Sequence, residues 1–487
     1  MVLLRVLDKS LGVVSMIVLA RLLTPGDFGL VAMAMSIVAL VELLSAFNFD
    51  MALIQNQRAG RTEFDSAWTL NVTLGTASGV LLLLGAVPSA AFYGDPRLVW
   101  LVVALAAAPL IGGLENIGVV VFRKELDFRR EFLFLLVKRL LSFIATLIFA
   151  FTLRDYWALV LGTLFGRTAG TLLSYVVHPY RPKFGLGAAR KILSFSAWFL
   201  ANNLLYFLLH RSSDFVVGKA LGAPALGVHA ISYEIANLPT TNMIAPINRV
   251  VYPAYTRVAS DRAALGRSFL RVLGLVAMVA IPAGVGIAAI SDRLVGLALG
   301  ARWLEAVPLI EILAIAGAIG AVQTNVGYIY MALGTPRTQT VLAVAYVCLL
   351  LPLMLLGVHF FQLRGVALAF LATALLHTPL TFGLVGKDLS IRAKDLVRPM
   401  VRPILAAGAM YSVVKSLPPL GAESATVLGV LYLGAAIFLG VLVYGGGVMA
   451  CWLFAGRPPS AEQEVLTGIA AALRKLRASR RERQGAS

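Results

Sequence analysis

The stretch ARLLTPGDFGLVAMA, residues 20–34, interrupts an apolar N-terminus with one arginine, one proline, one aspartate and two glycines. Thr24 can cap the helix that follows, Pro25 suits its first position, and Asp27 stands three residues after the cap. This order approximates a capping box, in which two side chains satisfy free backbone N–H groups at a helix start. The stretch therefore predicts a sharp turn between two membrane-spanning helices. Arg21 is expected to anchor the first of them at the membrane interface.

The composition around this stretch is that of a membrane protein. Of the 487 residues, 59% are hydrophobic and 14% are charged, and the mean hydropathy is +0.85. Soluble proteins carry about 25% charged residues. The net charge of +18 does not indicate nucleic acid, because the basic residues are spread over short breaks between apolar runs, as the positive-inside rule predicts. We expect no nucleic-acid partner.

Fourteen apolar segments are long enough to cross a bilayer, which takes about 20 residues. If the N-terminus is cytoplasmic, the breaks on that side hold 27 Lys and Arg residues and the opposite breaks hold 8. This asymmetry predicts that both termini are cytoplasmic. The first segment lacks a cleavage site and is expected to be retained. The segments are 2–22, 27–51, 67–92, 97–121, 132–152, 156–178, 193–218, 225–252, 268–290, 304–332, 338–359, 365–385, 399–416 and 425–454.

The opening stretch has an echo 198 residues later. Residues 20–34 align with GKALGAPALGVHAIS at 218–232, which matches Gly29 to Gly227 and Arg21 to Lys219. A second echo aligns residues 116–118 with 325–327. Repeats six spans apart share one membrane orientation, so they predict two six-helix lobes related by a pseudo-two-fold axis, with a cavity between them.

The predicted fold is therefore an all-α polytopic membrane protein of about 14 helices. Its expected parts are a first lobe over 1–180, a second lobe over 190–386, an extra C-terminal helix pair over 397–455 and a basic cytoplasmic tail over 458–487. Residues 460–477 place Leu466, Ile469, Leu473 and Leu476 on one helical face, which favours a helix on the inner leaflet. A partly disordered, solubilising tail is the alternative.

Two quoted stretches carry a family resemblance. ARLLTPGDFGLVAMA followed by DMALIQ (50–55), and NIGVVVFRKELDFRREF (116–132), resemble the polysaccharide transport (Wzx-type) flippases of the multidrug/oligosaccharidyl-lipid/polysaccharide exporter superfamily. The resemblance implies a flippase in the bacterial inner membrane that moves undecaprenyl-diphosphate-linked oligosaccharide repeat units by alternating access. It also implies membrane lipids, a polysaccharide polymerase and a chain-length regulator as partners, in exopolysaccharide, lipopolysaccharide or capsule biosynthesis.

Cations inside the predicted spans are the candidates for binding a diphosphate. A charge within a membrane segment is expensive, and Arg can bind phosphate oxygens bidentately. The alternatives are ion pairs at three-residue spacing, Arg5 with Asp8 and Arg211 with Asp214, and snorkelling of Lys138 and Arg139 toward the interface. The substrate-binding candidates are Arg5, Lys9, Lys138, Arg139, Arg167, Arg211 and Arg249.

Acids and prolines inside the spans suggest two further roles. A carboxylate in a partly dry cavity can exchange protons, so Asp8, Glu42, Glu115 and Glu234 are candidates for ion coupling. Helix–helix hydrogen bonds or salt bridges are the alternative for these acids. Prolines kink helices, so the seven-residue repeat of Pro239, Pro246 and Pro253 predicts a hinge. A static kink is the alternative.

No enzyme constellation is found in the sequence. A phosphate-binding glycine–lysine loop, an H-E-x-x-H motif and a nucleophile–base set are missing, and the five histidines are isolated in sequence. The two cysteines offer no metal-ligand spacing, so neither a cofactor nor a metal is expected. A multidrug exporter of the same superfamily and a membrane glycosyltransferase or polymerase are the alternative functions. Cation-rich spans disfavour the first, and the short loops disfavour the second.

Overall fold

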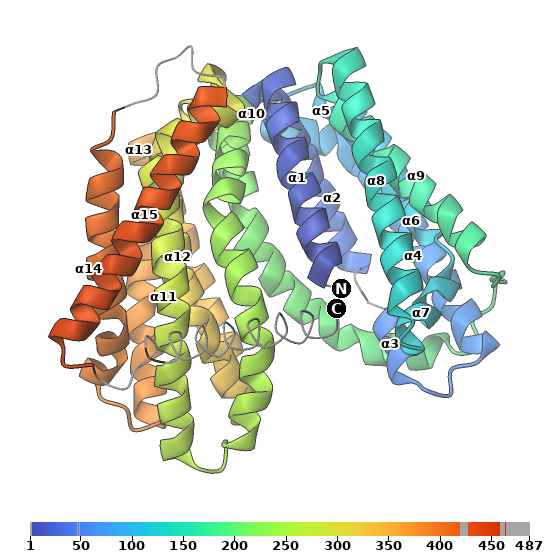
Figure 1. Cartoon of the computed structure of the whole chain (residues 1–487). Coiled ribbons are helices and arrows are strands. Elements are labelled where there is room, and N and C mark those ends of the chain that lie inside the picture. Colours follow the sequence, from blue (N-terminus) through green and yellow to red (C-terminus); the bar gives the residue numbers. More distant parts are fainter. Residues whose placement is uncertain (1, 46, 48, 419–426, 458–462, 464–487) are drawn as a thin grey trace, which may run out of the picture. The chain divides into compact units, whose positions relative to one another are not determined.

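The computed structural model describes residues 2–45, 47, 49–418, 427–457 and 463. The elements in this part of the chain are helices, without strands (Figure 1). The longer ones are α1 (Val2–Leu22), α2 (Pro25–Ser45), α4 (Arg61–Tyr93), α8 (Phe128–Leu153), α9 (Trp157–Val177), α10 (Ala189–Arg257), α11 (Arg262–Leu294), α12 (Ala306–Ala332), α13 (Pro336–Asp388), α14 (Ala393–Lys415) and α15 (Val427–Phe454). The shorter ones are α3 (Phe49–Gln55), α5 (Leu98–Leu105), α6 (Ala107–Gly113), η1 (Ile117–Val119), α7 (Val120–Lys124), η2 (Val295–Leu299) and η3 (Ala301–Trp303).

These helices confirm a polytopic all-α membrane protein. Within the described residues, 9 helices are long and apolar enough to cross a membrane, or 10 if the pair Leu98–Gly113 and Ile117–Lys124, bent by 58°, is one span. Two of the long helices are each two segments, because Gly222 breaks α10 (φ 82°) and Gln362 breaks α13 (φ 50°). With α1 and α14, the helical segments match the fourteen that hydropathy predicts.

The chain forms two compact units. Unit 1 holds Met1–Ala230 and Ala298–Trp303, and unit 2 holds Ile231–Leu297 and Leu304–Ser487. The chain therefore passes from one unit to the other inside α10, and a short piece of the α11–α12 connection returns to unit 1. The lobe boundaries expected from the repeat stay a prediction. The expected inner-leaflet helix over 460–477 lies outside the described residues, apart from position 463.

The turn between α1 and α2 is the capping box that the sequence predicts. The backbone N–H and the hydroxyl of Thr24 donate to Asp27 Oδ2 at 2.8 and 2.6 Å, and the Asp27 N–H donates to Thr24 Oγ1 at 3.3 Å. Asp at the third position thus substitutes for the usual Glu or Gln. The box fixes the start of α2 immediately after α1.

The returning segment 298–303 holds this turn in place. Arg21 Nε donates to the Ala298 carbonyl at 3.0 Å, and Trp303 Nε1 donates to the Ala20 carbonyl at 2.8 Å. The fully buried Trp303 ring lies edge-on to Phe28, with centroids 5.3 Å apart. The end of α1 is therefore tied to a part of the chain about 280 residues away.

The aligned glycines of the repeat contact one another inside unit 1. A Cβ on Gly29 would lie 1.6 Å from the Ala223 carbonyl oxygen, and a Cβ on Gly227 would lie 1.9 Å from the Pro25 carbonyl oxygen. Position 223 is position 25 plus the offset of 198, so the contact is reciprocal. Reciprocal contact between equivalent residues is what a two-fold axis produces. The backbones of α2 and α10 approach this closely because neither glycine has a side chain.

Unit 2 is built on α11, which packs against α12, α14 and, over a shorter stretch, α15. Its core contains the buried side chains of Tyr255, Phe269, Tyr330 and Val385. Helix α14 also packs along α15, whereas α13 and α14 contact each other little. The space between α13 and α14 is the groove described next.

Candidate functional site

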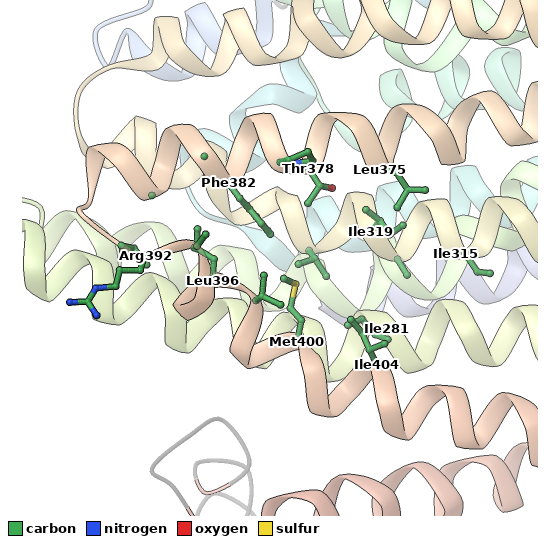
Figure 2. A pocket seen from close by; sticks show the side chains of 18 of the residues that line it. Ile281, Ile315, Ile319, Leu375, Thr378, Phe382, Arg392, Leu396, Met400 and Ile404 are labelled. Carbon is green, nitrogen blue, oxygen red and sulfur yellow. The ribbon is translucent and has the colours of Figure 1, made fainter. Parts of the chain in front are cut away.

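A groove of about 1010 Å³ lies in unit 2 between α11, α12, α13 and α14 (Figure 2). Its wall is mostly aliphatic and aromatic, and Phe382 of α13 and Met400 of α14 point toward one another across it. Glycines at 383, 386 and 408 line it as well, which keeps the groove wide. An elongated apolar molecule is the ligand that such a wall accommodates.

The groove has one basic end. Lys387, Ser390 and Arg392 line it where α13 passes into α14, while Ile315 lies toward the other end (Figure 2). The Lys387 and Arg392 side chains are exposed. Two cationic side chains therefore stand at this end of the groove, and the Arg392 guanidinium is directed outward from it (Figure 2).

The groove is also open along its side. Leu375, Val397 and Ile404 line it, and their side chains are 54%, 51% and 53% exposed. Exposed apolar side chains on spanning helices face hydrocarbon rather than water. The open side of the groove is therefore apolar, like its wall.

Four of the charged residues that the sequence selected form two ion pairs in unit 1. Arg167 Nη2 of α9 lies 2.9 Å from Glu42 Oε1 of α2, and Arg167 Nη1 donates to the Ala108 carbonyl at 3.2 Å. Lys138 Nζ of α8 lies 2.6 Å from Glu115 Oε2. The structure thus brings two substrate-binding candidates together with two ion-coupling candidates. All four side chains are half-buried, so solvent screens both ion pairs in part.

The remaining candidates lie in several places. Arg211 pairs with Asp214 at 3.1 Å, the three-residue pairing named as its alternative. The exposed Arg139 guanidinium lies against α1, with Nη2 3.4 Å from where a Cβ on Gly12 would be. Lys9, Glu234 and Pro253 are exposed. The side chains of Arg5, Asp8, Pro239, Pro246 and Arg249 lie outside the described residues.

The proposed hinge prolines fall in a continuous helix. The backbone of α10 is helical at positions 239, 246 and 253, and the break that the structure describes in this helix is at Gly222. A hinge at the three prolines stays a prediction.

The stretch 116–132 is a structural junction of unit 1. Asp127 caps α8 by accepting from the Arg130 N–H at 3.1 Å. Arg123 Nε donates to Glu131 Oε1 at 2.7 Å, and its guanidinium lies 3.7 Å from Asp50 Oδ2. The alternating charges of this stretch therefore bind α3, α7 and α8 together.

Sequence reasoning missed two polar clusters of unit 2. In the first, Lys415 Nζ lies 2.7 Å from Glu311 Oε1 and 3.9 Å from Asp292 Oδ2, and the buried Arg293 donates to the Leu417 carbonyl at 2.5 Å. Glu311 lies within the predicted span 304–332, but its partner is 104 residues away, so no spacing rule joins them. The second cluster surrounds His377, which is isolated in sequence.

Comparison with known proteins agrees with this architecture. The model of the family described as polysaccharide biosynthesis protein matches residues 18–308. The lipopolysaccharide biosynthesis protein WzxC of Escherichia coli (strain K12) is 27% identical over 381 residues, which cover 77% of each chain.

Two solved structures have a similar fold. The lipid II flippase MurJ in its inward closed conformation gives a TM-score of 0.74 at 13% identity, covering 93% of this chain and 99% of that one. An inward-facing multidrug resistance MATE family transporter of the MOP superfamily gives 0.59 at 16% identity, covering 79% and 96%. At these identities the likeness concerns the fold alone, and it confirms the polytopic all-α fold expected from the sequence. Because the family model matches more than half of its length, this multi-pass membrane chain belongs to the polysaccharide biosynthesis protein family.

Proposed function

We propose that the protein is a flippase that moves undecaprenyl-diphosphate-linked oligosaccharide repeat units across the bacterial inner membrane, from the cytoplasmic to the outer face. The groove of unit 2 carries this proposal, because its wall is apolar and Lys387 and Arg392 stand at one end. A polyprenyl chain suits the wall, and a diphosphate suits the cationic end. Family membership, the relative named for lipopolysaccharide biosynthesis and the flippase fold support the same assignment.

The orientation of the chain gives this groove a direction. With both termini in the cytoplasm, the break that contains Lys387 and Arg392 is cytoplasmic, where lipid-linked repeat units are made. The headgroup then passes between the two predicted lobes, 1–180 and 190–386, by alternating access, with no bond made or broken. A polymerase and a chain-length regulator act on the product outside.

The paired cations of unit 1 have a specific role in this scheme. Arg167 and Lys138 are each neutralised by a glutamate, so a diphosphate gains them by displacing Glu42 and Glu115. Glu42 and Glu115, the carboxylates of these pairs, are the groups of unit 1 proposed to couple transport to an ion. Arg5, Lys9, Arg139, Arg211 and Arg249 complete the proposed cationic set.

The groove is tested by filling it. Gly383 lines the groove and a Cβ there meets nothing within 4 Å, so Gly383→Phe places a ring in the groove without a backbone clash. In a deletion strain of the host, this variant is expected to fail to restore surface polysaccharide and to accumulate lipid-linked repeat units on the cytoplasmic face. Gly445→Phe in α15, which also has open space around its Cβ, is the matched control. It is expected to restore surface polysaccharide and to prevent the accumulation of lipid-linked repeat units.

The same strains separate the alternative functions. Normal surface polysaccharide in the Gly383→Phe strain contradicts the groove as the lipid path. Unchanged polysaccharide in the deletion strain, together with higher drug sensitivity, identifies a multidrug exporter, which the fold likeness to a MATE transporter supports. Repeat units that reach the outer face but stay unpolymerised in the deletion strain identify a polymerase.

A further inference from the structure

The second polar cluster of unit 2 lies behind the wall of the groove. His377, in the second segment of α13, is 6% exposed, and its ring is edge-on to Tyr346 with centroids 5.3 Å apart. A buried polar ring of this kind is costly unless both nitrogens have hydrogen-bond partners. The identity of those partners decides which protonation state the site favours.

Both ring nitrogens of His377 face oxygen atoms. Nδ1 lies 2.8 Å from Gln323 Oε1, and Nε2 lies 3.0 Å from the carbonyl oxygen of Leu342. The orientation of the Gln323 amide follows from its other end, where Nε2 donates to Thr378 Oγ1 at 2.7 Å and to the Ala374 carbonyl at 3.3 Å. Neither of these two oxygens carries a proton, so the imidazolium form, with an N–H at each ring nitrogen, satisfies both contacts.

The same atoms also satisfy a neutral ring after two rotations. Nε2–H keeps its bond to Leu342, and the Gln323 amide turns over so that its NH₂ group donates to Nδ1. The Thr378 hydroxyl, which now donates to the Ala374 carbonyl at 2.7 Å, then turns to donate to Gln323 Oε1. No backbone movement is needed. The orientations of the Gln323 amide and the Thr378 hydroxyl therefore change with the protonation of the histidine.

This network reaches the groove through Thr378. The Thr378 side chain lines the groove beside Leu375 and Phe382 (Figure 2). The proton on Nδ1 is therefore separated from the contents of the groove by Gln323 and Thr378.

The other ionisable groups around the ring are few. Tyr346 packs on it from the first segment of α13, Tyr233 of α10 contacts Phe370 of the second segment, and the Thr381 hydroxyl lies 3.1 Å from Nδ1. The cations that line the groove are Lys387 and Arg392 at its basic end. Among the described residues, no carboxylate contacts the His377 ring.

We propose that His377 is a proton-binding site of the transport cycle. Binding of a proton to His377 and binding of a lipid chain in the groove weaken each other. Filling the groove with hydrocarbon removes water from the Thr378 side, which raises the cost of a charged imidazolium behind it. Coupling of this kind is reciprocal, so a bound proton weakens lipid binding by the factor by which the lipid weakens proton binding. The consequence is exchange of one proton inward for one lipid-linked unit outward. This inference rests on the proposed function, because it needs the groove to take the lipid chain.

The test measures lipid binding against pH with a probe that has no ionisable group. Full-length protein in nanodiscs is crosslinked with photoreactive undecaprenol, and labelling of groove peptides is quantified by mass spectrometry. One linked proton predicts that the apparent affinity rises with pH by up to about tenfold per pH unit over part of the range. His377→Gln, which cannot become charged, is expected to bind at every pH without this rise. His359→Gln, at an exposed position of the same helix, is the matched control and keeps it.

A second variant and a second measurement keep the proposal testable if the His377→Gln variant misfolds. Gln323→Met removes the oxygen that lies 2.8 Å from Nδ1, so it is expected to reduce the pH dependence while His377 remains. In parallel, ¹⁵N spectra of histidine-labelled wild-type protein are expected to contain a buried ring with both nitrogens protonated at low pH, and this signal is lost when probe is added.

The outcomes separate the two proposals. Labelling of the groove that does not change with pH in the wild type overturns the proton site and leaves the flippase assignment intact. A pH slope that survives in His377→Gln does the same. Absence of groove labelling at any pH overturns both, since the lipid path is then elsewhere.

Discussion

Adding one methyl group at Gly29 is expected to force α2 and α10 apart. A Cβ at this position would lie 1.6 Å from the Ala223 carbonyl oxygen and 2.5 Å from its carbonyl carbon. An ordinary C···O contact is about 3.3 Å, so the helices must separate by roughly 1.7 Å. The obstacle is backbone on both sides, and no side chain can rotate away. Overpacking of this kind costs about 1–3 kcal/mol, and we expect the upper part of that range.

The direction of the change in thermal unfolding temperature distinguishes the Gly29 contact from the general effect of alanine on helix stability. Gly85→Ala in α4 is the matched control, because a Cβ there meets nothing within 4 Å. Alanine is favoured over glycine in a helix by about 1 kcal/mol, so this control is expected to raise the thermal unfolding temperature. Gly29→Ala is expected to lower it, in the same detergent and by the same fluorescence assay.

The reciprocal geometry adds a stricter test. Gly227→Ala places a Cβ 1.9 Å from the Pro25 carbonyl oxygen and is expected to destabilise to a similar degree. Once either methyl group has separated the helices, the second methyl group clashes less. The double variant should therefore lose clearly less stability than the sum of the losses in the two single variants. Full additivity, or an unfolding temperature for Gly29→Ala at or above that of Gly85→Ala, would refute the close contact.

Three further predictions concern single interactions. Arg167→Met removes the cation that lies 2.9 Å from Glu42 and is expected to lower stability by about 1 kcal/mol, whereas combining it with Glu42→Met restores stability but not polysaccharide export, measured by thermal unfolding and complementation. Asp27→Ala removes the acceptor of the α2 cap and should cost about 1 kcal/mol by thermal unfolding; no change means that the cap is redundant. Arg293→Met removes the side-chain donor to the Leu417 carbonyl, so we expect stability to fall by about 1–3 kcal/mol and proteolysis after α14 to become faster. An unchanged rate of proteolysis would contradict a role of Arg293 in holding the end of α14.

Most of the helical architecture could be predicted from the chain because hydropathy acts locally. Runs of about 20 apolar residues satisfy their own backbone hydrogen bonds in a membrane, so their ends can be recognised without a partner. The cap at Thr24 and Asp27 is local as well. The alignment of Gly29 with Gly227 indicated a repeat, but it did not indicate that the two glycines contact each other. That contact depends on where the symmetry axis passes.

The candidate site could be predicted only in part, because its chemistry is made by residues far apart in sequence. Arg167 and Glu42 were both selected as charges within spans, yet their pairing joins helices 125 positions apart and was not foreseen. His377 was set aside as an isolated histidine, since its partners Gln323 and Leu342 lie 54 and 35 residues away. The groove is lined by four helices, and no periodicity in any one of them predicts it.

The lateral opening of the groove limits what a lipid chain can contribute to recognition. A chain that moves from the bilayer past Leu375, Val397 and Ile404 exchanges one hydrocarbon environment for another. The hydrophobic gain is therefore limited to the water that the chain displaces inside the groove, and packing contacts give only a small preference. Substrates with the same chain are then distinguished by their sugars and phosphates alone. The chain leaves as easily as it enters, so release of the lipid on the far side need not slow the transport cycle.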